Sequence, residues 1–121
     1  RIFKGNVVIH CFEPSGSSFS VLEQNLTGHK NVILHNVALG DKKCVMTLFS
    51  DEKASGLASL YKRKNIEVKV TEEVNVETLD EFCAKNSVAY INYLKLDVEG
   101  HEFAVLKGGE RMLKEGCIDW I

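Results

Sequence analysis

Continuous apolar runs, separated by segments of helical periodicity, constrain the fold of this chain most. Runs over residues 7–12, 32–39 and 90–96 are apolar or nearly so, and each is followed by polar or turn-forming residues. Strands that are buried on both faces belong to parallel sheets with helices on both sides. The pattern therefore predicts an α/β fold built on a mostly parallel sheet.

A first helix is expected after the serines that follow Pro14. Phe19, Leu22 and Leu26 recur at the spacing of one helix face. Serine hydroxyls can accept hydrogen bonds from the free N–H groups of a first turn. Gly28 is expected to end this helix.

Two further strands and a second helix are expected in the middle of the chain. The run over residues 44–49 is apolar, whereas residues 66–71 alternate apolar and polar side chains. Such alternation predicts a half-exposed strand, antiparallel to its neighbour. Residues 51–59 are expected to form a loop, and Thr78 and Glu81 fit a capping box that opens a short helix.

The last third of the chain predicts one more helix and the start of one more strand. Phe103, Leu106 and Leu113, joined by Val105 and Met112, are expected on the apolar face of this helix, which ends at Gly116. Residues 118–121 open another apolar run. Because the chain starts without a helix cap and stops inside a run, we expect one domain that is truncated at both ends.

Composition limits the classes of function. The chain has 121 residues and a net charge of −2, which gives no electrostatic field that favours nucleic acid. No apolar run approaches the ~20 residues that span a bilayer. The four cysteines form no Cys-x-x-Cys pair, which indicates buried thiols in a reducing compartment. A cytoplasmic protein with one domain over residues 1–121 is expected.

Polar residues stand at three expected strand ends, where ligands bind in open α/β sheets. Glu13 and Pro14 follow the first run, and Asn36 and Val37 lie within the second. A carboxylate such as that of Glu13 can accept hydrogen bonds from both hydroxyls of a ribose, or it can cap a helix. The Asn36 amide suits an adenosine ligand or the backbone of the next turn equally well.

The third strand end carries Asp97, Glu99 and His101 around Gly100. These side chains could orient an acceptor group and take its proton. Two carboxylates one residue apart could instead hold a divalent cation. Acidic residues at a helix start are also favourable without any ligand.

Five stretches of the chain resemble the FkbM family of methyltransferases, in order and with family-like spacing. They cover most of the chain, and the last of them is the most specific. The stretches are Cys-Phe-Glu-Pro at 11–14, Asn-Val-Ala-Leu-Gly-Asp at 36–41, Ala-Ser-Leu-Tyr at 58–61, Val-Glu-Thr-Leu-Asp-Glu-Phe at 76–82 and Leu-Lys-Leu-Asp-Val-Glu-Gly-His-Glu at 94–102.

The resemblance implies a Rossmann-like class I methyltransferase that uses S-adenosylmethionine and acts on a hydroxyl oxygen of a small molecule or sugar. It places the residues that bind the cofactor at the first two strand ends: Glu13, Pro14, Asn36 and Val37. It places the residues beside the methyl group and the acceptor at the third: Asp97, Glu99 and His101. Asp97 would also border the cofactor.

One departure from the family pattern and several alternatives remain. The family has a first strand and a glycine-rich loop for the methionine end of the cofactor, and nothing before Glu13 supplies them. We therefore expect this piece alone to bind cofactor poorly, or to self-associate through an unpaired strand edge. The alternatives are a non-catalytic Rossmann-like binding domain, a metal-dependent hydrolase that uses Asp97 and Glu99, and a nicotinamide dehydrogenase.

Overall fold

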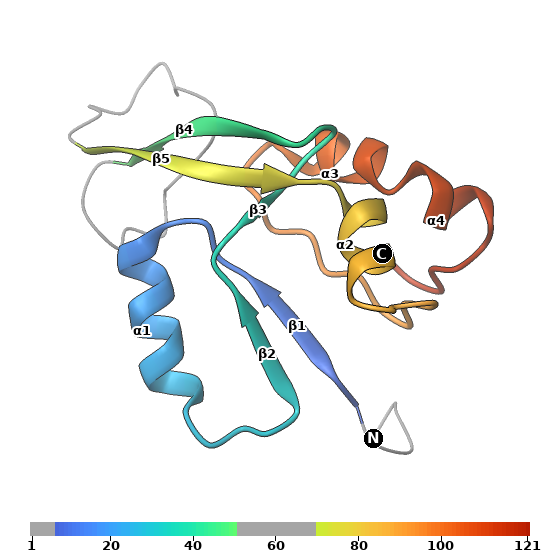
Figure 1. The fold of residues 1–121 in the computed structure, drawn as a ribbon, viewed down its shortest axis with the longest axis horizontal. Coiled ribbons are helices and arrows are strands. Elements are labelled where there is room, and N and C mark those ends of the chain that lie inside the picture. Colours follow the sequence, from blue (N-terminus) through green and yellow to red (C-terminus); the bar gives the residue numbers. More distant parts are fainter. Residues whose placement is uncertain (1–6, 51–69) are drawn as a thin grey trace.

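The computed structural model describes residues 7–50 and 70–121, which form an α/β arrangement with two small sheets (Figure 1). The expected loop at 51–59 and the stretch at 58–61 lie outside the described residues. In the described ranges, no helix is long and apolar enough to span a membrane.

The first sheet is a parallel pair joined by a helix. β1 (Ile9–Phe12) pairs with β2 (Val32–His35), and α1 (Gly16–Leu26) connects them. The helical face expected in α1 is half-buried, and Gly28 just beyond it has a φ of 90°. Because the two strands are parallel, the residues that follow both of them lie at the same edge of the sheet.

The second sheet has the order β3-β5-β4. Its strands are β3 (Ala38–Leu39), β4 (Cys44–Ser50) and β5 (Val70–Glu77). β3 is parallel to β5, whereas β4 is antiparallel to it. Most of the strand expected over residues 66–71 lies outside the described residues, and β5 continues beyond its expected end to Glu77. The α/β class is thus as expected, but in the described residues this mixed sheet is separate from the first, and one continuous, mostly parallel sheet is not seen there.

The expected single strand over residues 32–39 is also wrong, because the chain leaves the first sheet at Asn36. The Asn36 amide nitrogen donates to the backbone carbonyls of Glu13 and Pro14, at 2.9 and 3.0 Å. An amide that bonds the neighbouring backbone competes with continuation of a strand. The residues beyond it, β3, pair with β5 and not with β1.

Residues 90–96 do not form the expected strand. Ile91 makes an isolated parallel bridge with Ile118, and Leu94 N–H donates to the Trp120 carbonyl at 2.9 Å. Along one strand of a regular parallel ladder, the residues that donate hydrogen bonds to the neighbouring strand are two positions apart. Here the donors are Ile91, which bonds the Cys117 carbonyl, and Leu94, three positions later. The backbone bend at Asn92 changes the phase of the hydrogen bonds, so a continuous ladder does not form.

The helix start predicted at Thr78 is confirmed, with the threonine side chain as the N-cap. Thr78 Oγ1 accepts a hydrogen bond from Glu81 N–H at 3.1 Å and opens α2 (Leu79–Lys85). Phe82 and Cys83 of this helix are buried in the core. Local sequence determines this element, because the cap and the buried face lie within one short segment.

The helix expected between residues 100 and 116 is divided, and its predicted face is correct at Val105 and Met112 but wrong at Phe103. α3 (Glu102–Gly108) and α4 (Glu110–Lys114) meet at Gly109, and Phe103 is 79% exposed. A Cβ on Gly108 would lie 2.0 Å from the Gly40 carbonyl oxygen. This close approach of two backbones selects the buried side of α3 and turns Phe103 outward.

One hydrophobic core connects the helices with the second sheet, and the ends of β1 and of the 90–98 segment pack against it. Phe12, Leu96 and Val98 contact this core as half-buried residues. The buried members are Leu39, Leu79, Phe82, Cys83, Val105 and Met112. The core therefore anchors the residues that precede Glu13 and those on both sides of Asp97.

Candidate functional site

The turn after β1 holds the first predicted site residue in place. Glu13 N–H donates to the His35 carbonyl at 3.0 Å, and Glu13 Oε1 accepts from Ser15 N–H at 2.9 Å. The Asn36 amide reaches the carbonyls of Glu13 and Pro14 from the end of β2. The structure thus brings Glu13, Pro14 and Asn36 together at the carboxyl edge of the first sheet.

A carboxylate from the second sheet completes this turn. Glu72 Oε1 accepts a hydrogen bond from Gly16 N–H at 2.9 Å. Burial raises the pKa of Glu13, the Ser15 N–H lowers it, and the negative charge of Glu72 raises it further. Ser15 is the N-cap residue of α1, as predicted, but its hydroxyl contacts Ser17 Oγ and makes no capping hydrogen bond; carboxylates accept from the N–H groups of Ser15 and Gly16 instead.

Glu72 was not predicted from the sequence, although a signal for it was present. In β5 the side chains of Val74 and Val76 are buried, and Glu72 lies at the next position of the same register. Thr71 and Glu73 are exposed on the other face. One acid in the inward positions of an alternating strand indicates a partner for that acid inside the fold.

Asp97 lies on the outward side of an extended segment. Its Oδ2 atom is 3.3 Å from Lys95 Nζ, and both side chains are about 70% exposed. Leu96 and Val98 point the other way and pack against the core. Asp97 is therefore accessible to a ligand, and an ion pair this exposed contributes little to stability.

Glu99 and Gly100 form the centre of a tight turn that leads into α3. Their φ angles are 53° and 98°, and His101 N–H donates to the Val98 carbonyl at 3.2 Å. Positive φ at both central residues is typical of a type I′ turn. Glu99 holds this conformation at a cost of about 1–2 kcal/mol, because it is not a glycine. The turn therefore changes the direction of the chain sharply between Asp97 and the start of α3.

His101 is buried, unlike Asp97. It is 4% exposed, and a Cβ on Gly40 would lie 3.1 Å from its Nε2 atom. Burial lowers its pKa, against the opposing charges of Asp41 and Glu102. Burial therefore favours the neutral imidazole, which lies at the start of α3, directly after the turn at Glu99 and Gly100.

The predicted site residues thus form two groups. Val37 is half-buried between β2 and β3, next to the Glu13 turn. In the described part of the chain, no hydrogen bond or ion pair joins the Glu13 and Asp97 side chains. The two groups share the core on which Phe12 and Val98 pack.

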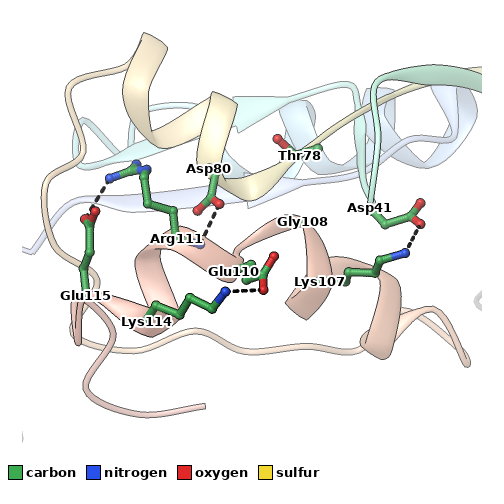
Figure 2. Close-up of a pocket in the computed structure, with 9 residues that line it drawn as sticks. All are labelled: Asp41, Thr78, Asp80, Lys107, Gly108, Glu110, Arg111, Lys114 and Glu115. Carbon is green, nitrogen blue, oxygen red and sulfur yellow. Dashed lines mark hydrogen bonds and ion pairs between the residues drawn. The ribbon is translucent and has the colours of Figure 1, made fainter.

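A separate recess of about 450 Å³ lies between α2, α3 and α4 (Figure 2). Its charges are paired within the protein: Lys107 with Asp41 at 3.2 Å, Arg111 with Glu115 at 3.0 Å and Lys114 with Glu110 at 2.6 Å. Asp80 accepts hydrogen bonds from two backbone N–H groups at the start of α4. The predicted site residues do not line this recess.

Within residues 7–50 and 70–121, no group of three or more histidine, cysteine, aspartate or glutamate side chains could hold a metal ion. The cation-binding alternative for Asp97 and Glu99 lacks a third protein ligand in this part of the chain.

Comparisons with known proteins agree with one another. A family model described as the methyltransferase FkbM domain matches residues 3–118. A curated relative from Beauveria bassiana (strain ARSEF 2860), named Methyltransferase 1, is 28% identical over 119 aligned residues. The match covers 83% of this chain and 48% of that protein, so the chain spans about half the length of the relative. No solved structure matches the chain.

Proposed function

The chain belongs to the FkbM methyltransferase family, and from this we propose that it binds S-adenosylmethionine and transfers the methyl group to a hydroxyl oxygen of a small molecule or sugar. We propose further that its strands belong to a Rossmann-like sheet, with the cofactor across the ends of β1 and β2. The observation that carries the proposal is the junction at which Asn36 bonds the Glu13 turn.

The Glu13 turn fits the adenosine part of this cofactor. Its carboxylate is half-buried at the carboxyl end of a parallel strand, and the Ser15 N–H fixes its direction. Carboxylates at this position of α/β folds accept hydrogen bonds from ribose hydroxyls. Val37, half-buried beside Asn36, offers an apolar surface for the adenine ring.

Asp97 is the residue that we propose as general base. The cofactor supplies an electrophilic methyl group on a sulfonium when it is bound. A hydroxyl acceptor must lose its proton as the new oxygen–carbon bond forms, and the exposed Asp97 carboxylate can take that proton. Aligning the reactants can contribute about 7–11 kcal/mol. His101 supports the Asp97 turn from inside, and Glu99 shapes it.

The test of this proposal is the affinity of the full-length protein for S-adenosylmethionine, measured by calorimetry. Glu13→Gln is expected to lower the affinity about 10- to 100-fold, because a charged acceptor of two hydroxyl groups is lost. The matched control is Glu23→Gln on the exposed side of α1, which is expected to bind as the wild type does.

Equal affinities of Glu13→Gln and the wild type would contradict the proposed role of the turn. Tight binding with no methyl transfer to any of a panel of sugars and hydroxylated small molecules would favour the alternative of a non-catalytic binding domain.

A further inference from the structure

Glu72 occupies a position of β5 that the strand otherwise gives to buried apolar residues. Val74 and Val76 on the same side are 5% and 3% exposed. Glu72 itself is half-buried, whereas its neighbour Glu73 is exposed on the opposite face. A carboxylate on the inward side of a strand requires a hydrogen-bond donor, because burial without one is costly.

That donor comes from α1, the helix that connects the two strands of the other sheet. Gly16 N–H, the first of α1, donates to Glu72 Oε1 at 2.9 Å, although the two residues are 56 positions apart. A Cβ on residue 16 would lie 3.0 Å from the same oxygen, so a side chain there would crowd the contact. Glycine at this position lets the carboxylate of β5 approach the backbone of α1.

Two carboxylates thereby hold two consecutive N–H groups of one turn. Glu13 accepts from Ser15 N–H, and Glu72 accepts from Gly16 N–H, both at 2.9 Å. Asn36 holds the carbonyl side of the same turn. The direction of the Glu13 carboxylate therefore depends on a residue of the second sheet.

We propose that Glu72 is a positioning residue for cofactor binding, which fixes the turn that presents Glu13 to the ribose hydroxyls and places a second negative charge beside it. This inference rests on the proposed function, since it acts through Glu13. Glu72 need not touch the cofactor, and its effect reaches the ligand through the Ser15–Gly16 backbone.

The charge of Glu72 makes this role measurable. The groups that face Glu13 are the Ser15 backbone, the neutral amide of Asn36 from β2 and the carboxylate of Glu72 from β5. The Glu72 charge contributes to the raised pKa of Glu13, together with burial. Removing that charge is therefore expected to lower the pKa of Glu13 and to extend cofactor binding to more acidic solutions.

The experiment measures the affinity of the full-length protein for S-adenosylhomocysteine by calorimetry between pH 5 and pH 8. Glu72→Gln keeps an oxygen acceptor for Gly16 N–H but removes the charge, whereas Glu72→Ala removes both. Glu73→Gln is the matched control, one residue away on the exposed face. Circular dichroism checks that each variant folds, and Glu72→Gln is sufficient if Glu72→Ala does not.

We expect the acid limit of binding to move to lower pH in Glu72→Gln, with an affinity close to that of the wild type at pH 8. Glu72→Ala is expected to lose about tenfold in affinity at pH 8, because the turn loses a charged hydrogen bond. Glu73→Gln is expected to match the wild type throughout.

A pH profile of Glu72→Gln identical to that of Glu73→Gln would overturn the inference. A uniform loss of affinity in Glu72→Gln, without a shift of the acid limit, would also overturn it and leave Glu72 a merely structural residue. Absence of binding by the wild type at every pH is a different result, because it contradicts the proposed function itself.

Discussion

The turn after β1 and the turn before α3 both carry candidate site carboxylates, but they are built in opposite ways. Four hydrogen bonds that involve side chains fix the first: Glu13 and Glu72 each accept one from a backbone N–H group, and Asn36 donates two to backbone carbonyls. The second turn has positive φ at Glu99 and Gly100, and it follows Asp97, whose carboxylate is exposed.

This difference between the turns matches two proposed roles, cofactor binding by Glu13 and proton transfer by Asp97. A carboxylate that is locked by the backbone suits a ligand group that stays in place, such as a pair of hydroxyls. An accessible carboxylate on a sharply turned segment suits a group that must meet a varying acceptor and exchange a proton with it. We therefore expect Glu13 to determine cofactor affinity and Asp97 to determine turnover.

The largest expected effect tests whether Glu13 and Asp97 have separate roles. Asp97→Asn in the full-length protein is expected to lower kcat about 10²–10⁴-fold, the usual contribution of a general base. Its affinity for S-adenosylmethionine should stay within about twofold of the wild type, because Asp97 does not hold the ribose. Steady-state methyl transfer and calorimetry on the same preparation measure the two quantities.

Lys95→Gln serves as the control, because it removes the exposed partner of Asp97 but no proposed reacting group. Equal losses of turnover and affinity in Asp97→Asn would assign Asp97 to cofactor binding or folding and remove the contrast between the two turns.

A smaller effect compares the histidines beneath the two turns. His35 stacks on Phe12, its Nε2 atom lies 3.0 Å from His10 Nδ1, and burial, His10 and Lys85 all lower its pKa. Burial also lowers the pKa of His101, but nearby carboxylates oppose that shift.

A histidine whose folded-state pKa is lowered binds protons more readily when unfolded. Its contribution to stability is complete above the unfolded pKa of about 6.5 and is lost as the pH falls below it. We therefore expect the melting temperature to fall between pH 7 and pH 5, and His35→Gln and His101→Gln each to flatten that slope. Exposed His29→Gln is the control, and slopes equal to that of the control in both variants would contradict this expectation.

The smallest effect concerns the open edge of the first sheet. β1 pairs with β2, and in the described ranges no other strand pairs with β1. Ile9 on this strand is 42% exposed. Unpaired strand edges favour association between chains. We expect the 121-residue chain alone to form weak dimers at high concentration, measured by sedimentation.

Ile9→Lys is expected to weaken these dimers, whereas Val21→Lys on α1, where the side chain is 48% exposed, is expected to leave them unchanged. Dimers that resist Ile9→Lys and respond to Val21→Lys would place the contact elsewhere on the chain.

Sequence reasoning succeeded where the determinants are local. The Thr78 cap and α2 follow from four neighbouring residues, and the parallel pair β1–β2 follows from apolar runs on either side of a helix. The position of Glu13 directly after β1 is also confirmed, because the end of this strand is marked by the residues beside it.

Sequence reasoning failed where distant backbones meet. The exposed side of α3 depends on the contact between Gly108 and Gly40, which no periodicity shows. The interrupted segment at 90–96 depends on how its hydrogen bonds meet residues 117–120. The contact of Glu72 with Gly16 joins β5 to α1 across 56 positions of the chain, so the alternating pattern of β5 indicates an unusual acid but not its partner.

We propose that the carboxyl ends of β1 and of the 90–97 segment face one adenosyl ligand, and a crystal structure of the full-length protein with S-adenosylhomocysteine can decide this. In that structure, Glu13 is expected to accept hydrogen bonds from the ribose hydroxyls, and Asp97 is expected to lie beside the sulfur atom. A ligand bound elsewhere, or bound with Asp97 remote from its sulfur atom, would disprove the proposal.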